Sequence, residues 1–508
     1  MSTAHRVAKN TMFLYGRMAI TVFISLYTTR LILGALGVED FGIFNLIGGT
    51  IAMLGFLNAS MAAASQRFMS FAEGTGDKQR QKEIFNVSFF LHLGVAVIVG
   101  LALYLFGFWL FDGFLNIPTE RIDAARSVYY FMILSTMFTV MSVPYDAVIN
   151  ARENMLLYSV VGVGESLLKL GAALIVVHTM SDKLVTYGWL MMSITILVLI
   201  IYRIYCHSHY TECTINFRRY FKKPLFKEMT SFAGWSFLTT SVDMVTFYGL
   251  GIILNLFFGA VLNAAQSVAN QISGQLSIFS HNMFKALNPV IVKKEGAGDR
   301  NGMQRAVITG AKINFSINAF LFIPFILEVS YILKVWLKNV PEWSAIFCQL
   351  LLVQILLESF IIPLHSGLRA QGNIKRFSIY KSLSKIILLP IVMFLFHSNF
   401  PPYYMYLASI TVTIIGLAVT MYYAHVNCQI SVRSYLLNVI LPCVSAFLVT
   451  FIFSLLPRLL IEQNLLRTII TFVISMLLFA IFTYKLTFNS EERQVIKSVF
   501  EKTLRRLK

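Results

Sequence analysis

The chain has 508 residues, of which 57% are hydrophobic and only 13% are charged. A soluble domain averages about 25% charged residues, so this composition excludes a water-soluble globular protein and predicts an all-α polytopic membrane protein. The net charge of +18 would suggest nucleic acid as a partner of a soluble chain, but here the basic residues concentrate in connectors and tails, and we expect no nucleic-acid partner.

A helix needs about 20 mostly apolar residues to cross a bilayer. The apolar runs predict about fourteen transmembrane helices, in chain order 11–33, 41–65, 84–108, 125–149, 156–178, 184–206, 229–256, 263–290, 304–329, 344–366, 377–398, 403–425, 437–457 and 465–488. The first run is too long for the apolar region of a signal peptide and carries Arg17 and Arg30, so we interpret it as a retained span.

Lysine and arginine are concentrated in alternate connectors, beginning with the one that follows the second span. Basic residues of these connectors include Lys78, Arg152, Lys222, Arg300 and Arg369. Because cytoplasmic loops are enriched in basic residues, we expect these connectors and both termini to be cytoplasmic.

Two phrases occur twice. Residues 73–78 read Glu-Gly-Thr-Gly-Asp-Lys and residues 295–300 read Glu-Gly-Ala-Gly-Asp-Arg, and at the same offset of 222 residues Gly37 corresponds to Gly259. At an offset of 219 residues, Pro144, Ala151, Asn154, Tyr158 and Ser159 correspond to Pro363, Ala370, Asn373, Phe377 and Ser378. The copies lie six spans apart, which predicts two parallel six-helix repeats.

The repeats define the expected domains. These are a first six-helix bundle (1–206), a cytoplasmic linker (207–228), a second six-helix bundle (229–428), two extra transmembrane helices (429–488) and a basic cytoplasmic tail (489–508).

Polar residues inside spans are candidate functional groups, because they are costly in lipid. The eighth span is the most polar, with a row along one face that comprises Asn263, Gln266, Asn270, Ser277, His281, Lys285 and Asn288. We expect this row to line a substrate cavity, where amides and hydroxyls would hydrogen-bond sugars; deep packing against protein is the alternative.

Arg17 in the first span and Asp243 in the seventh lie on polar stripes that correspond between the repeats. Arg17 is a cavity candidate, with snorkelling to the interface as the alternative, and Asp243 is a candidate coupling charge.

Other intramembrane charges lie in the fifth, tenth and eleventh expected spans. Glu165 and Lys169 are spaced for a structural pair within one helix, and Glu358 lies on an inward face of the tenth span. Lys381 and Lys385, one turn apart in the eleventh span, have no acidic residue nearby in sequence, and such unpaired cations favour an anionic ligand.

We find no Walker A loop, H-E-x-x-H or G-x-S-x-G motif, and none of the five cysteines forms a C-x-x-C pair. We therefore expect no enzyme, cofactor or metal site. A membrane polymerase or acyltransferase is a less favoured alternative. A polymerase would be expected to have a large periplasmic loop, and the connectors expected on the periplasmic side are short.

The chain resembles Wzx-type O-antigen flippases and polysaccharide transporters of the multidrug/oligosaccharidyl-lipid/polysaccharide superfamily. The resemblance rests on Arg30 to Phe44, on Arg67 with residues 74–77, and on Gly259 to Pro289.

The resemblance implies a MATE-like V of two bundles around a central cavity. It further implies flipping of an undecaprenyl-pyrophosphate-linked oligosaccharide across the bacterial inner membrane. The expected partners are this substrate, membrane lipids, a coupling H⁺ or Na⁺ and the polysaccharide polymerase machinery. A lipid II flippase and a cation-coupled drug exporter of the same fold are the alternatives.

Overall fold

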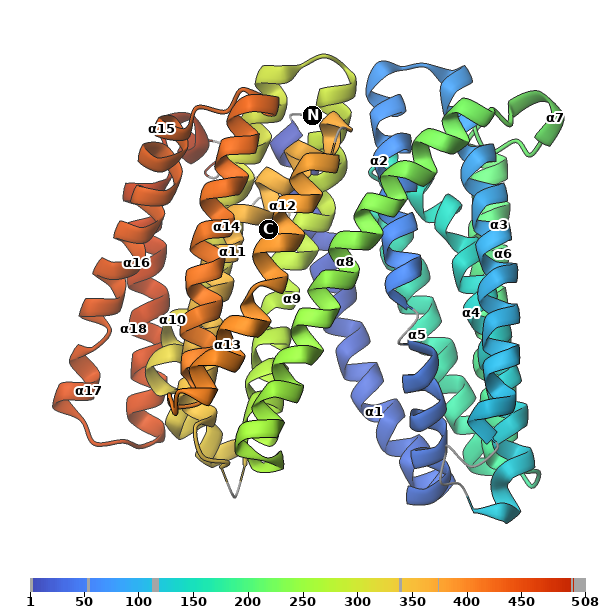
Figure 1. Ribbon diagram of the computed structural model, residues 1–508, viewed down its shortest axis with the longest axis horizontal. Coiled ribbons are helices and arrows are strands. Elements are labelled where there is room, and N and C mark those ends of the chain that lie inside the picture. The colour runs from blue at the N-terminus through green and yellow to red at the C-terminus, as the bar shows by residue number, and fades with distance from the viewer. Residues whose placement is uncertain are drawn as a thin grey trace, which may run out of the picture. The chain divides into compact units, whose positions relative to one another are not determined.

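The computed structural model describes residues 3–52, 55–111, 118–337, 340–372, 374–494 and 497. Helices joined by short turns make up this part of the chain, and no strand occurs in it (Figure 1). The first nine are α1 (Thr3–Ala52), α2 (Gly55–Thr75), α3 (Lys78–Trp109), α4 (Ile122–Ala151), α5 (Met155–His178), α6 (Lys183–His209), α7 (Phe217–Tyr220), α8 (Lys223–Phe258) and α9 (Ala260–Gly296). The others are α10 (Arg300–Trp336), α11 (Ser344–Gln371), α12 (Lys375–Ile386), α13 (Leu388–His397), α14 (Tyr404–Cys428), α15 (Val432–Tyr435), α16 (Leu441–Phe453), α17 (Leu456–Leu460) and α18 (Leu465–Phe482).

Twelve helical segments of the described residues are long and apolar enough to cross a membrane. The other two expected spans, 41–65 and 263–290, also fall on helices. The first extends from the end of α1 into α2, and the second lies in α9, whose polar row lowers its hydropathy. Large apolar side chains such as Phe23, Leu256 and Phe394 are at least 69% exposed, as expected of a lipid-facing surface.

Two helices change direction where the sequence contains glycine or proline. The backbone of α1 leaves helical geometry at Gly37, where φ is 78° and ψ is 172°. The expected eleventh span is divided into α12 and α13 at Ile387, three residues before Pro390. Proline removes a helix hydrogen bond and clashes with the preceding turn, which explains the second break.

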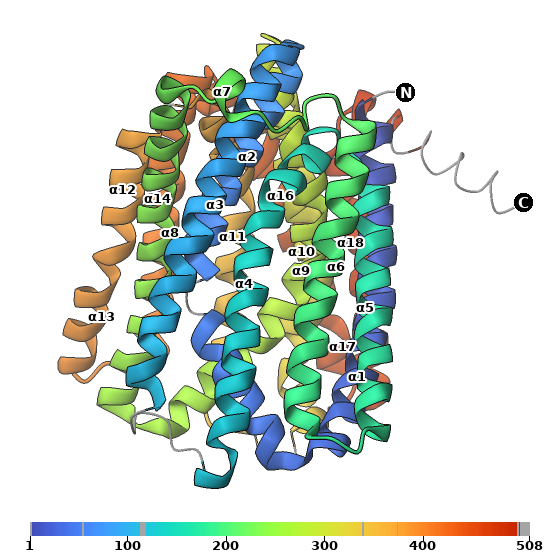
Figure 2. The ribbon, with the colours of Figure 1, turned by 90° about the vertical axis from the view of Figure 1, so that its right-hand side faces the viewer.

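The chain divides into two compact units. The N-unit is Lys9–Phe237, and the C-unit is Leu238–Lys508 with Met1–Ala8. In the N-unit, α4 packs against α2, α3, α5 and α6, and α6 lies beside it along much of its length (Figure 2).

In the C-unit, α11 has the same role and packs against α9, α10 and α14. The correspondence of α4 with α11 agrees with the repeat, since Pro144 lies inside α4 and Pro363 inside α11. The pairs α2·α3 and α9·α10 correspond in the same way.

The first repeated phrase forms the same turn in both units. Gly76 and Gly298 have φ of 72° and 73°, in the left-handed region that glycine tolerates best. The following Asp77 and Asp299 cap α3 and α10 by accepting hydrogen bonds from the backbone N–H groups of Arg80 and Gly302. The Lys294 ammonium, 2.7 Å away, lowers the pKa of the Asp299 carboxyl by hydrogen bonding to its charged form.

The two phrases also meet within each unit. Arg152 Nη1 lies 2.9 Å from Glu73 Oε1, and Arg152 Nη2 lies 2.7 Å from the buried carboxylate of Glu212. In the C-unit, the Gln371 side chain donates to Glu295, the counterpart of Glu73, at 2.9 Å. The end of the second repeat helix is therefore fastened to the end of the fourth in both units. Asn373 lies outside the described residues.

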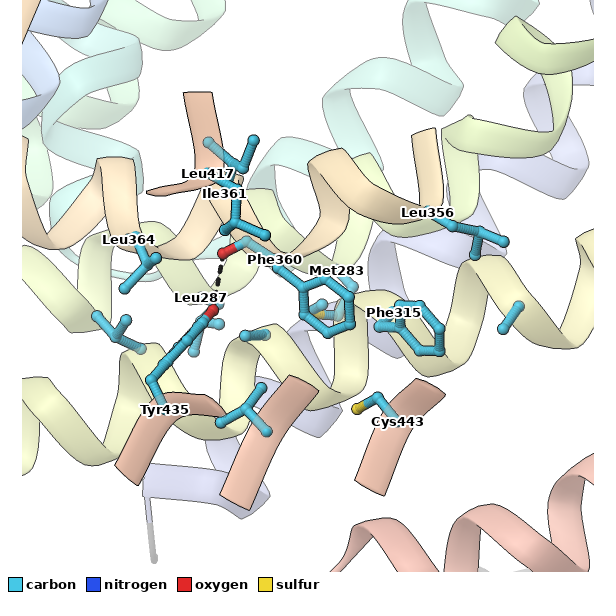
Figure 3. Close-up of a cluster of buried hydrophobic side chains, with 14 of the residues drawn as sticks. Met283, Leu287, Phe315, Leu356, Phe360, Ile361, Leu364, Leu417, Tyr435 and Cys443 are labelled. Atoms are coloured by element: carbon cyan, nitrogen blue, oxygen red, sulfur yellow. Dashed lines mark hydrogen bonds between the residues drawn. The ribbon is translucent and has the colours of Figure 1, made fainter. Parts of the chain in front are cut away.

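The largest core lies in the C-unit between α9, α10, α11, α14 and the C-terminal helices. Phe315 stacks on Phe360 at a centroid distance of 4.7 Å, and the buried Tyr435 hydroxyl donates to the Phe360 carbonyl oxygen at 2.7 Å (Figure 3). Helices α16 and α18 pack against each other and against α10 (Figure 1). The two helices beyond the repeats are thus integral to the C-unit.

Candidate functional site

Three intramembrane charges of the C-unit converge from α8 and α12. Lys385 Nζ lies 2.8 Å from Asp243 Oδ1, and Lys381 Nζ lies 3.4 Å from Asp243 Oδ2. The two lysines are one turn apart on α12, so both ammonium groups reach the same carboxylate. The expectation that these lysines are unpaired is therefore wrong. Their acidic partner lies 138 residues away from Lys381 in the chain, where sequence neighbours could not reveal it.

Helix α11 adds further polar groups around this cluster. Glu358 accepts a hydrogen bond from Gln354 at 3.3 Å, and its carboxylate lies within electrostatic range of Lys385. Arg369 lies within electrostatic range of Lys381, and the His365 ring hydrogen-bonds the Thr420 hydroxyl at 3.3 Å. We name Asp243, Lys381 and Lys385 the charge cluster. Its side chains are 37%, 17% and 36% exposed.

The polar row of α9 does not present one uniform surface. Ser277 is buried and His281 is exposed, while the remaining members are half-buried, namely Asn263, Gln266, Asn270, Lys285 and Asn288. His281 Nδ1 bonds to the Ser277 carbonyl oxygen at 2.7 Å within the helix. Asn288 accepts a hydrogen bond from Ser366 on α11. This end of the row therefore contributes to packing between α9 and α11.

Arg17 of α1 packs against α5 within the N-unit. Its guanidinium lies over the Tyr158 ring, 4.3 Å from the centroid, and a β-carbon at Gly162 would collide with it. The side chain is half-buried. This position stacks the cation on an aromatic face and differs from free extension towards water.

Glu165 and Lys169 form an ion pair of 2.6 Å within α5. Each side chain is about one third exposed, at 33% and 38%. The pair offsets both charges within a single helix, as the spacing of four residues allows.

Sequence reasoning did not single out Glu328 of α10, which is fully buried. It accepts hydrogen bonds from Arg467 at 2.8 Å and from Thr471 at 3.2 Å, both on α18. Its position within the apolar run 304–329 could have identified it as a buried charge that needs a partner. This pair joins α18 to α10, so we interpret it as structural.

A metal site has no support in the part of the chain that the structure describes. No group of three or more His, Cys, Asp or Glu residues there is placed to hold a metal ion. The described cysteines Cys206, Cys213, Cys348, Cys428 and Cys443 are buried free thiols.

Comparison with known proteins identifies the fold. The MatE family model matches residues 16–175, which is less than half of the chain. A solved outward-facing multidrug-resistance MATE transporter of the MOP superfamily superposes with a TM-score of 0.70 at 13% identity, over 84% of this chain and 97% of that one.

The chain has the MATE fold. A MATE structure in a bent conformation matches with a TM-score of 0.71 at 13% identity, over 84% of this chain and 99% of that one. A MOP superfamily transporter from Pyrococcus furiosus, whose binding pocket has reverse polarity, matches with a TM-score of 0.70 at 13% identity, over 84% of this chain and 95% of that one. No curated protein matches the chain. The MATE fold agrees with the expected polytopic helical architecture.

Proposed function

We propose that this protein is a flippase. It moves an undecaprenyl-pyrophosphate-linked oligosaccharide from the cytoplasmic to the periplasmic leaflet of the bacterial inner membrane by alternating access. The observation that carries the proposal is the charge cluster, in which two lysine ammonium groups lie on a partly exposed part of a membrane-spanning helix. A pyrophosphate headgroup needs such cations in place of water when it crosses about 30 Å of hydrocarbon.

The other cavity candidates complete this proposal. The amides and hydroxyls of α9 would hydrogen-bond the sugars, while Arg17 and Lys285 would supply further positive charge. A proton or Na⁺ moving down its gradient is the proposed energy source, since the sequence has no phosphate-binding loop for ATP. Membrane lipids surround the helices, and the polysaccharide polymerase would receive the flipped product.

A cation-coupled drug exporter is the second candidate, because the MatE match and the multidrug-resistance MATE structure point to that function. The charge cluster argues against it, since a cationic drug would be repelled by two lysines and attracted by only one aspartate. In the Pyrococcus furiosus transporter, the reverse polarity of the binding pocket suggests a different function for that protein. A lipid II flippase shares the pyrophosphate chemistry and differs in the saccharide.

The test is deletion of the gene in its own host, with extraction of lipid-linked oligosaccharides and detection of surface polysaccharide. We expect the lipid-linked precursor to accumulate while surface polysaccharide is lost. The plasmid-borne gene should restore both. Normal surface polysaccharide in a deletion strain that lacks a second flippase would contradict the proposal.

A further inference from the structure

In the charge cluster, the Asp243 carboxylate is the anion that faces the two lysines. The Asp243 carboxylate forms ion pairs with both lysines, with Oδ1 at 2.8 Å from Lys385 Nζ and Oδ2 accepting a hydrogen bond from Lys381 at 3.4 Å. Two oxygens on one centre that bridge two ammonium groups reproduce the contacts that a phosphate group would make. The cluster therefore has the geometry of an occupied oxyanion site, with an aspartate as the occupant.

The occupant and its site come from different helices. Asp243 belongs to α8 and both lysines belong to α12. The end of α8 packs in a hydrophobic cluster with α9 and α13, where Leu254 is buried and Phe258 lies 4.8 Å from Phe396 between ring centroids, whereas α12 packs against α14. The ion pairs join α8 to α12 through charged side chains, separately from this apolar packing, and the three side chains are 17–37% exposed.

We propose that Asp243 is an internal counter-ion that the phosphate group of the ligand displaces. The ligand chemistry is a phosphate oxyanion, and Lys381 and Lys385 are its binding residues. Displacement breaks the ion pairs between α8 and α12, so binding is coupled to the contact between these two helices. This inference rests on the proposed function for the identity of the displacing anion, and it names the part of the substrate that the cluster receives.

Competition sets the affinity in this arrangement. A phosphate must replace the Asp243 carboxylate in its ion pairs with the two lysines. Neutralising Asp243 without changing its shape removes the competitor and leaves both lysines in place. Asp243→Asn should therefore bind phosphate more tightly, whereas a simple structural ion pair would give weaker binding or lost folding.

The experiment measures inorganic pyrophosphate binding to the purified full-length protein in zwitterionic nanodiscs by calorimetry. Asp243→Asn should bind about tenfold more tightly than the unaltered protein, the size of one charge-assisted hydrogen bond. Lys381→Gln/Lys385→Gln should abolish binding. Glu165→Gln, which removes one intramembrane carboxylate from the N-unit, is the matched control and should leave affinity unchanged.

Weaker or unchanged affinity in folded Asp243→Asn would overturn the proposal. The proposal would also be overturned if Asp243→Asn and Asp243→Ser failed to fold while Asp243→Glu folded, because the negative charge would then be required for folding. The same calorimetric measurement in nanodiscs that contain phosphatidylglycerol tests whether a lipid headgroup supplies the phosphate. Loss of pyrophosphate binding there would assign the site to a resident lipid headgroup and overturn displacement by the substrate. Tighter binding by Asp243→Asn together with normal surface polysaccharide in the deletion strain would reject the flippase but retain the counter-ion.

Discussion

At Gly37 and Gly259 the backbone adopts one unusual conformation twice. The angles are φ 78° and ψ 172° at Gly37, and φ 77° and ψ −177° at Gly259. This region is essentially restricted to glycine. Each glycine separates the first helix of a repeat from the second. The sequence alone shows that Gly37 and Gly259 occupy corresponding positions. The shared backbone conformation explains why both positions are glycine.

Gly259→Ala should therefore destabilise the protein. A β-carbon in this conformation costs about 1–3 kcal/mol, although it would meet no neighbouring atom within 4 Å. Gly274→Ala in α9 is the matched control, since Gly274 is helical and also has no neighbour within 4 Å. Thermal unfolding in detergent should show a lower midpoint for Gly259→Ala alone. Equal midpoints would contradict the strain argument.

Two glycines of α5 test the position of Arg17. Gly162→Ala would collide with the guanidinium, whereas Gly164→Ala would have no neighbour within 4 Å. We expect about 1–3 kcal/mol of destabilisation for the first and none for the second, by thermal unfolding. Combining Gly162→Ala with Arg17→Ala should remove most of the penalty. A penalty that persists in the double variant would show that Arg17 does not pack there.

At the scale of elements, the attachment of α18 to α10 depends on a buried ion pair. Arg467→Met leaves the fully buried Glu328 carboxylate without its cation, and breaking such a pair costs about 3–5 kcal/mol. We expect a large loss of folded protein in the membrane, measured by fluorescence-detected chromatography. Glu328→Gln/Arg467→Met should recover much of the yield. Equal yields for the single and double variants would exclude this role.

Some elements could be predicted from local sequence, while others depend on tertiary packing. Asp77 and Asp299 follow turn glycines and cap the next helix. The residues that form this turn and cap are neighbours in the chain, so the local sequence is enough to predict it. The break between α12 and α13 is also a local effect, because Pro390 removes a hydrogen bond within its own helix. The pairing of Asp243 with Lys381 and of Glu328 with Arg467 joins residues more than 130 positions apart. The sequence singled out Asp243, Lys381 and Lys385 as costly charges within spans, but helix packing decides which charges pair.

At the scale of the whole molecule, the distribution of basic residues predicts the membrane orientation. The described native cysteines are buried, so cysteines introduced at exposed positions can be labelled selectively. In intact cells, an impermeant maleimide should label Met180→Cys and should not label Lys222→Cys. Labelling of Lys222→Cys alone would reverse the proposed orientation.

The central claim is the transport of a pyrophosphate-linked oligosaccharide. Its most direct test is reconstitution of the purified protein in vesicles that contain the lipid-linked oligosaccharide in both leaflets. An impermeant glycosidase is then added outside. We predict that the protein makes the inner-leaflet pool accessible, and that Lys381→Gln/Lys385→Gln, inserted at equal abundance, abolishes this effect. The same protected pool with and without protein would contradict the account, most clearly if the vesicles took up a cationic drug instead.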